Sequence, residues 1–114
     1  MIGRIRRMRR FFGQTGAPSL LLALDQGLEQ GMLPGLSSLP ELLQTVEALP
    51  IQGVLMNRGL AQVHGLDIRA DQAVIVQLTA GTRHGLPPYS RSLVCSVAEA
   101  LRVGAEFVAV EICI

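Results

Sequence analysis

Four short apolar runs, separated by loops and helix-like stretches, constrain the fold of this chain more than any other feature. The runs are Ser19–Leu24, Ile51–Met56, Ala73–Leu78 and Glu106–Ile114. They are largely continuous apolar segments rather than alternating apolar and polar residues, a pattern typical of strands buried on both faces of a parallel sheet. The sequence therefore predicts an α/β fold with parallel strands in the order β-α-β-α-β-α-β.

Helix signals lie between these runs. Residues 25–36 are rich in Gly and Pro and predict a loop. Ser38 and Glu41 have the Ser-x-x-Glu spacing of a capping box and predict the start of a helix that Pro50 ends. Residues 57–64 predict a short helix. Residues 79–88 predict a second loop, and the apolar stripe over residues 93–101 predicts a helix that Gly104 ends.

The spacing of the runs points to a particular architecture. Consecutive strand starts are 32, 22 and 33 residues apart, against a mean unit of about 31 residues in a (β/α)8 barrel. We therefore expect the first half of a TIM (β/α)8 barrel over residues 19–114, preceded by a basic N-terminal arm over residues 1–18. Because the last run ends without a polar tail, we expect the chain to be a fragment.

Charge is concentrated at one end of the chain. Five of its ten basic residues fall in the first ten positions, and the remainder carries five cations against nine acids. This balance argues against a basic nucleic-acid-binding surface and favours a solvated arm. A transit peptide over residues 1–24, and an arm that binds nucleic acid or anionic lipid, stay as alternatives. All ten basic residues are arginine, and the chain contains no lysine.

Cysteine and histidine are too sparse to indicate a disulfide framework or a metal site. Cys95 and Cys113 both lie in apolar runs, where a free thiol packs as a small hydrophobe, and they predict a reducing, cytoplasmic compartment. His64 and His84 have no second ligand at metal-binding spacing, so we expect no metal and no cofactor. The apolar runs are shorter than the roughly 18–20 residues of a membrane span, so we expect no membrane association.

A family resemblance follows from the segment 21–31, Leu-Leu-Ala-Leu-Asp-Gln-Gly-Leu-Glu-Gln-Gly. It resembles the first strand and loop of class I fructose-bisphosphate aldolases of the archaeal and bacterial barrel type. Further similarity covers residues 53–59, 74–82 and 97–106, which are similar to the second strand, the third strand with its Gly-Thr loop, and the helix before the fourth strand. One departure is Gln30, where the family often has His.

The resemblance implies a lyase that cleaves phosphorylated ketoses through a Schiff base, as in glycolysis and gluconeogenesis. It implies a catalytic role for Asp25, in proton transfer and in orienting the imine. Gln26, Gly27 and Asn57 are candidates for substrate binding beside it, although Asn57 is equally typical of a turn. The family's reactive lysine lies on the sixth strand, outside these 114 residues, so we expect the chain alone to be inactive.

Thr82 and Arg83 follow the third strand and form a candidate phosphate site, because backbone N–H groups and a guanidinium bind phosphate well. The family binds its phosphates in the other half of the barrel, which favours an ordinary loop here. The alternative function is a non-catalytic half-barrel, either a truncated pseudoenzyme or an interaction module that self-associates or binds a partner through its open strand edges.

Overall fold

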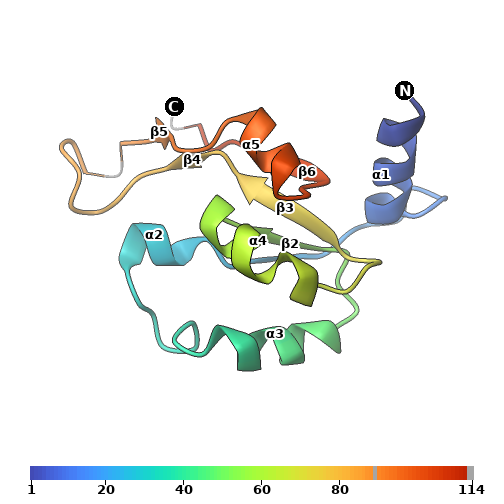
Figure 1. Ribbon diagram of the computed structural model, residues 1–114, viewed down its shortest axis with the longest axis horizontal. Helices are drawn as coiled ribbons and strands as arrows, with labels where there is room; N and C mark the ends of the chain where they lie inside the picture. The colour runs from blue at the N-terminus through green and yellow to red at the C-terminus, as the bar shows by residue number, and fades with distance from the viewer. Residues whose placement is uncertain (89, 113–114) are drawn as a thin grey trace.

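The computed structural model describes residues 1–88 and 90–112 (Figure 1). Cys113 and the end of the expected strand 106–114 lie outside this described part. In chain order the elements are α1 (Ile2–Phe12), β1 (Leu21–Ala23), α2 (Gln26–Gln30), α3 (Leu39–Glu47), β2 (Gly53–Met56), α4 (Arg58–His64), a 3₁₀ turn η1 (Gly65–Asp67), β3 (Ala73–Gln77), β4 (Thr79–Ala80), β5 (Ser92–Leu93), α5 (Val97–Arg102) and β6 (Phe107–Ala109).

The four apolar runs form one parallel sheet in the order β1-β2-β3-β6. Leu21 pairs with Gly53, Gly53 with Ala73, and Ile75 with Phe107. Each strand is shorter than its apolar run, because the flanking residues make single bonds outside the ladder, as when Leu24 N–H donates to the Leu55 carbonyl. The sheet confirms the expected parallel α/β arrangement.

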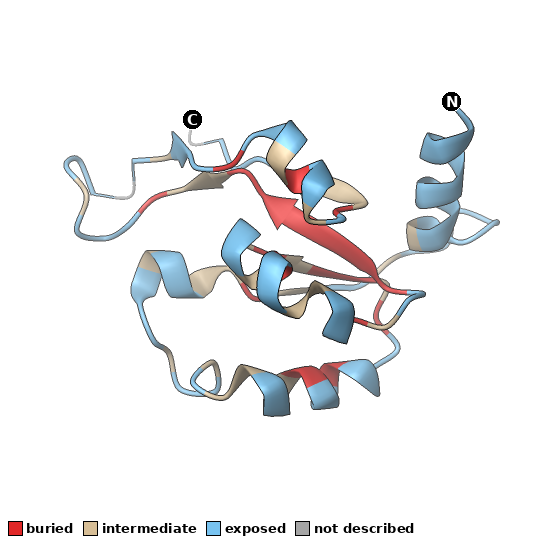
Figure 2. Ribbon diagram, viewed as in Figure 1, coloured by how far each residue is buried: buried red, intermediate tan, exposed pale blue. Residues whose placement is uncertain are grey.

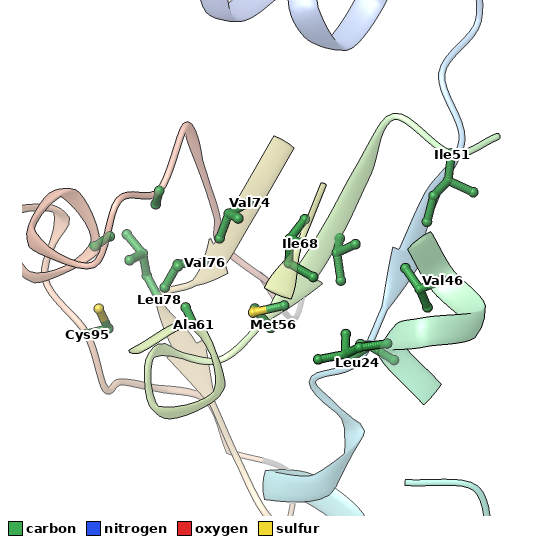
Figure 3. Packing of buried hydrophobic residues seen from close by; sticks show 14 residues of the cluster. Leu24, Val46, Ile51, Met56, Ala61, Ile68, Val74, Val76, Leu78 and Cys95 are labelled. Atoms are coloured by element: carbon green, nitrogen blue, oxygen red, sulfur yellow. The ribbon is translucent and has the colours of Figure 1, made fainter. Parts of the chain in front are cut away.

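The main core lies between one face of the sheet and helices α3, α4 and α5 (Figures 1 and 3). Val54, Met56 and Val76 are fully buried at its centre, and β3 is buried along its whole length (Figure 2). The helices contribute Leu43, Val46, Ala61 and Ala100, and the loop before α5 contributes Cys95. β2 and β3 are the two inner strands of the sheet, each with a neighbouring strand on both sides.

Helix α1 was not predicted from the sequence, which indicated only a solvated basic arm over residues 1–18. The basic arm is helical, and its side chains are exposed apart from Phe11 (Figure 2). The Phe11 ring lies 5.3 Å from that of Phe107, and the Arg10 guanidinium donates to Glu106 at 2.7 Å. Its last turn is thereby fixed at the amino-terminal ends of the strands, opposite the end where α2 and β4 lie (Figure 1).

The two helix-start predictions have different outcomes. The helix after Ser38 forms, but the Ser38 side chain makes no capping hydrogen bond, so the predicted box is absent. A complete capping box occurs instead at Ser96 and Glu99, which start α5. The predicted helix over 93–101 therefore starts too early, because Leu93 belongs to β5.

Two expected loops contain short elements. The segment 25–36 includes α2, which Gly31 ends with a φ of 79°, a conformation that favours glycine. The segment 79–88 begins with β4, which pairs antiparallel with β5 through Thr79 and Leu93. Both elements are too short to give a periodic signal in the sequence.

Candidate active site

The carboxyl ends of the parallel strands bring two sequence-predicted residues, Asp25 and Asn57, to one edge of the sheet together with Thr79. Asn57 follows β2 directly, and Asp25 and Thr79 follow β1 and β3 after one residue each. Asp25, Asn57 and Thr79 line a small cavity together with Gln77 and Gly81. In open and closed parallel sheets this edge is where active sites form.

Asp25 is one of the two acidic residues that line this cavity, and Glu29 is the other. It stands at the N-cap position of α2, but its side chain accepts no capping hydrogen bond. The side chain is thus not used to hold the helix, and the half-buried residue lines the cavity together with Asn57. This placement differs from that of Asn57, whose Oδ1 accepts the Leu60 N–H at 3.0 Å and caps α4.

Gln26 and Gly27, which follow Asp25 in the sequence, lie outside the cavity that Asp25 lines. Gln26 donates from Nε2 to the Ala23 carbonyl at 3.1 Å, so its side chain closes the turn between β1 and α2. Gly27 lines a separate, mainly apolar groove between α2, α3 and α4. Neither residue lines the cavity that Asp25 and Asn57 share.

The structure separates Thr82 and Arg83 from the cavity. Both are exposed on the loop between β4 and β5. Thr82 Oγ1 accepts the His84 N–H at 2.9 Å, and Arg83 Nε lies 3.3 Å from His84 Nε2. Their side-chain contacts are local to the loop, and the cavity that Asp25 lines includes Gly81 but not these two residues.

Sequence reasoning missed Arg91, which is the main cation at this edge. Its Nη2 lies 2.5 Å from Glu29 on α2 and 2.7 Å from Glu111 after β6. Only 15% of its side chain is exposed. Burial lowers the pKa of Arg91, but hydrogen bonds and charge from Glu111 and Glu29 outweigh it and leave the pKa above its ordinary value. No local pattern could have found this cluster, since its members lie 20 and 62 residues apart in the chain.

The Arg91 cluster closes the candidate site. Arg91 and Glu29 line the same cavity as Asp25. The volume of this cavity is about 10 Å³, which is room for about one water molecule. The Arg83 N–H also donates to the Glu29 carbonyl at 3.4 Å, and the Glu111 N–H donates to Thr79 Oγ1 at 3.0 Å. Thr79, Arg83 and Arg91 are thus held at the carboxyl edge by Glu29 of α2 and by Glu111 after β6.

Neither a metal cluster nor a membrane span is found among residues 1–88 and 90–112. No group of three His, Cys, Asp or Glu side chains there has an arrangement that could hold a metal ion. No helix in the described ranges is both long and apolar enough to cross a bilayer.

Comparison with curated proteins finds synthases of which this chain spans less than half the length. The chain is 26% identical over 112 residues to 2-amino-3,7-dideoxy-D-threo-hept-6-ulosonate synthase 1 of Archaeoglobus fulgidus, covering 98% of this chain and 42% of that synthase. It is 27% identical over 106 residues to 2-amino-4,5-dihydroxy-6-oxo-7-(phosphonooxy)heptanoate synthase of Streptomyces griseus, covering 39% of that protein. No family model matches.

Comparison with solved structures finds aldolases. An archaeal fructose 1,6-bisphosphate aldolase matches with a TM-score of 0.75 and 25% identity. A Schiff-base-forming fructose-1,6-bisphosphate aldolase matches with a TM-score of 0.74 and 26% identity. Each match covers 94% of this chain and 43% of the aldolase. In sequence and in fold, the chain is therefore similar to the N-terminal half of a class I fructose-1,6-bisphosphate aldolase barrel.

Proposed function

We propose that this chain supplies the first four strands of a Schiff-base aldolase barrel that cleaves a phosphorylated ketose such as fructose 1,6-bisphosphate. The observation that carries the proposal is the placement of Asp25 at the carboxyl end of β1, where it lines a cavity with Asn57 and its side chain makes no capping hydrogen bond with α2. The likeness to Schiff-base-forming aldolases supports the choice of chemistry.

The reactive amine of this reaction comes from outside the 114 residues. A Schiff base needs a primary amine that can lose its proton, and an arginine guanidinium stays protonated. The chain contains no lysine. We therefore propose that it is inactive alone, and that a lysine from the other half of the barrel attacks the ketose carbonyl.

In the completed site the lysine nitrogen and the carbonyl carbon form an iminium, with loss of water. The bond between C3 and C4 then breaks, its electron pair moves toward the iminium, and the C4 hydroxyl gives up its proton to a base. Asp25 lies at the edge where this site forms, and we propose that it orients the iminium and assists proton transfer. Its negative charge favours the cationic intermediate.

Substrate entry requires a rearrangement of the Arg91 cluster. A space for about one water molecule is too small for a sugar phosphate. We propose that the β4–β5 segment shifts when substrate binds, as active-site loops do in many barrels. A cytoplasmic location is part of this proposal, and the buried free thiol of Cys95 supports it.

A chimeric barrel tests the proposal. Residues 1–114 are joined to the C-terminal portion of an archaeal aldolase that bears its catalytic lysine, and the product is compared with the unmodified chain. With dihydroxyacetone phosphate and borohydride, we expect a covalent adduct on the folded chimera and none on the chain alone. Asp25→Asn should lower the cleavage rate of the chimera by about a hundredfold, while Arg83→Gln serves as the matched control and keeps it. An adduct on the chain alone, or a folded chimera without cleavage, would contradict the proposal.

A second candidate function is an interaction module that works without catalysis. Exposed apolar side chains lie on both outer strands and on the residues next to them: Leu20, Leu21, Val108, Val110 and Ile112. Open edges of this kind pair readily with another chain. Sedimentation of the chain and of a Val108→Lys variant separates the two candidates, because a module that self-associates through β6 loses its dimer in the variant.

A further inference from the structure

We propose that helix α1 binds the surface of a membrane that contains anionic lipid, with its apolar side chains in the bilayer interface and its arginines among the headgroups. The basic arm is the part of the chain to which the proposed aldolase chemistry gives no role. It forms an 11-residue helix beside the amino-terminal ends of the strands (Figure 1). The inference concerns this helix alone, so it does not depend on the reaction proposed for the carboxyl edge.

One face of α1 is apolar and uncovered. Ile5, Met8 and Phe12 follow one another at intervals of three and four residues, which places them on the same side of the helix. Their exposed fractions are 42%, 43% and 37%, and all three line one open groove of about 550 Å³. Apolar side chains gathered on a surface in this way mark an interaction face.

The contacts that hold α1 to the sheet come from a different side of the helix. The Phe11 ring lies 5.3 Å from that of Phe107, and Arg10 forms an ion pair with Glu106 at 2.7 Å. Phe11 and Arg10 do not line the groove that contains Met8. The apolar face therefore stays available while the helix keeps its place on the folded chain.

Positive charge surrounds the apolar face. Residues 1–24 contain five arginines and no acid. Four of these arginines make no ion pair within residues 1–88 and 90–112: Arg4, Arg6, Arg7 and Arg9. Arg4 and Arg9 line the groove, and the helical repeat places them on opposite sides of the apolar side chains. A cluster of about four to eight cations on an amphipathic helix is typical of binding to anionic lipid.

An anionic lipid surface matches both features of α1, whereas nucleic acid matches only one. Nucleic acid attracts arginines through its phosphates, but it would leave Ile5, Met8 and Phe12 in water. A bilayer takes such side chains into the interface while its headgroups neutralise the arginines. This mode of binding needs no helix long enough to span the membrane, so the short apolar runs of the sequence do not exclude it.

The position of α1 makes membrane binding compatible with an accessible site at the carboxyl edge. α1 lies at the amino-terminal ends of the strands, whereas α2 and β4 lie at the opposite end (Figure 1). Asp25 and Asn57 line their cavity at that opposite end. A chain bound through α1 therefore keeps the carboxyl edge turned away from the bilayer.

Co-sedimentation of the full chain with lipid vesicles tests the proposal. We expect binding to phosphatidylcholine vesicles that contain about one third phosphatidylglycerol, little binding to pure phosphatidylcholine, and weaker binding at high salt. Met8→Gln should weaken the binding by about tenfold, because its side chain no longer enters the interface. Met32→Gln is the matched control, since it removes an exposed methionine outside α1, and it should stay within about twofold of the wild type.

The role of charge is tested by a second pair of variants. Arg4→Gln should weaken binding to the anionic vesicles by about fivefold. Arg83→Gln removes the same charge from the loop between β4 and β5, at the other end of the molecule (Figure 1). It should leave the affinity within about twofold. A circular dichroism melt of each variant checks its folding, since all four substituted side chains are exposed.

Oxidation of the wild-type chain by hydrogen peroxide gives a readout that needs no variant. Met8 and Met32 are both exposed, so both should be converted to the sulfoxide in the free chain. Anionic vesicles should protect Met8 and leave Met32 reactive. Peptide mass spectrometry after pepsin digestion measures the two rates.

Three outcomes overturn the proposal. The first is equal binding to anionic and neutral vesicles, or to neither. The second is equal affinity of Met8→Gln and Met32→Gln for the anionic vesicles, which would show attraction by charge alone, as nucleic acid would also exert. The third is protection of Met8 without vesicles that increases with the concentration of the chain, which would show that a second copy covers the apolar face.

Discussion

Phe11 lies so close to Gly53 that a β-carbon on the glycine would stand 3.0 Å from the ring atom Cε2. The same β-carbon would stand 3.2 Å from the Ala73 carbonyl oxygen and 3.3 Å from Ile75 Cδ1. Gly53, the first residue of β2, therefore packs against Phe11 in the last turn of α1. This contact explains why α1 keeps a fixed position on the sheet although its other side chains are exposed.

Gly53→Val should destabilise the chain by about 1–3 kcal/mol, because the added atoms overpack this contact. Urea unfolding followed by circular dichroism measures the loss. Gly27→Ala is the matched control, since a β-carbon there meets nothing within 4 Å. Equal stability of Gly53→Val and the wild type would show that α1 does not rest on Gly53.

Ser96→Ala should cost about 1 kcal/mol of stability, because the hydroxyl accepts the Glu99 N–H at the start of α5. Ser38→Ala should cost much less, since Ser38 makes no side-chain capping bond with α3. Thermal unfolding of the two variants distinguishes the formed cap from the unformed one. A larger loss in Ser38→Ala would reverse this assignment.

Glu99 should make the stability depend on pH in the acidic range. The Ser96 N–H, then the Ser96 hydroxyl, then the charge of Arg58 hold the pKa of Glu99 below its ordinary value. Since the folded pKa lies below the unfolded one, the stabilisation is fully present above the unfolded pKa of about 4.3. It is lost as the pH falls through the folded pKa.

The stability difference between the wild type and Glu99→Gln should therefore be largest near neutral pH and shrink below the unfolded pKa of Glu99. Urea titrations at a series of pH values measure this difference, and the subtraction removes the titration of other carboxylates. A difference that stays constant with pH would contradict the assignment.

Arg91→Met should loosen the segment between β4 and β5, because it leaves Glu29 and Glu111 without their shared cation. We expect amide exchange over residues 79–93 to become about tenfold faster, while β3 keeps its protection. Arg83→Met lies on the same loop and removes no ion pair that the described residues show, so it should leave the exchange rates nearly unchanged. Faster exchange in both variants would mean that loop composition, rather than the Arg91 cluster, sets the mobility.

Sequence patterns predicted the sheet well because burial dominates those segments. Ala73–Leu78 and Ile51–Met56 are apolar enough to be placed as buried strands from composition alone, and their parallel pairing follows from the helices between them. The position of Asp25 and Asn57 could be predicted for a related reason, since residues that follow a parallel strand lie at the carboxyl edge whatever their type; their roles stay a prediction.

The failures share a different cause, which is dependence on tertiary contacts. Ser38 has the spacing of a cap but not the backbone geometry, whereas Ser96 has both. Thr82 and Arg83 stay a predicted phosphate site, but the path of their loop places them outside the cavity that Asp25 lines, and the sequence did not indicate this path. Arg91 was missed because its two carboxylate partners lie on distant segments, and no local periodicity records such a contact.

The buried Cys95 thiol can be used as a chemical probe of how often the core between the sheet and the helices opens. Burial, followed by the nearby charge of Glu99, raises the pKa of Cys95, so little of the reactive thiolate forms in the folded chain. Alkylation of this sulfur, read by peptide mass, therefore counts only the moments when the layer between sheet and helices comes apart. The alkylation rate would therefore measure how often the core between the sheet and the helices opens. Measured on the chimeric barrel, it would show how the C-terminal portion changes the frequency of opening.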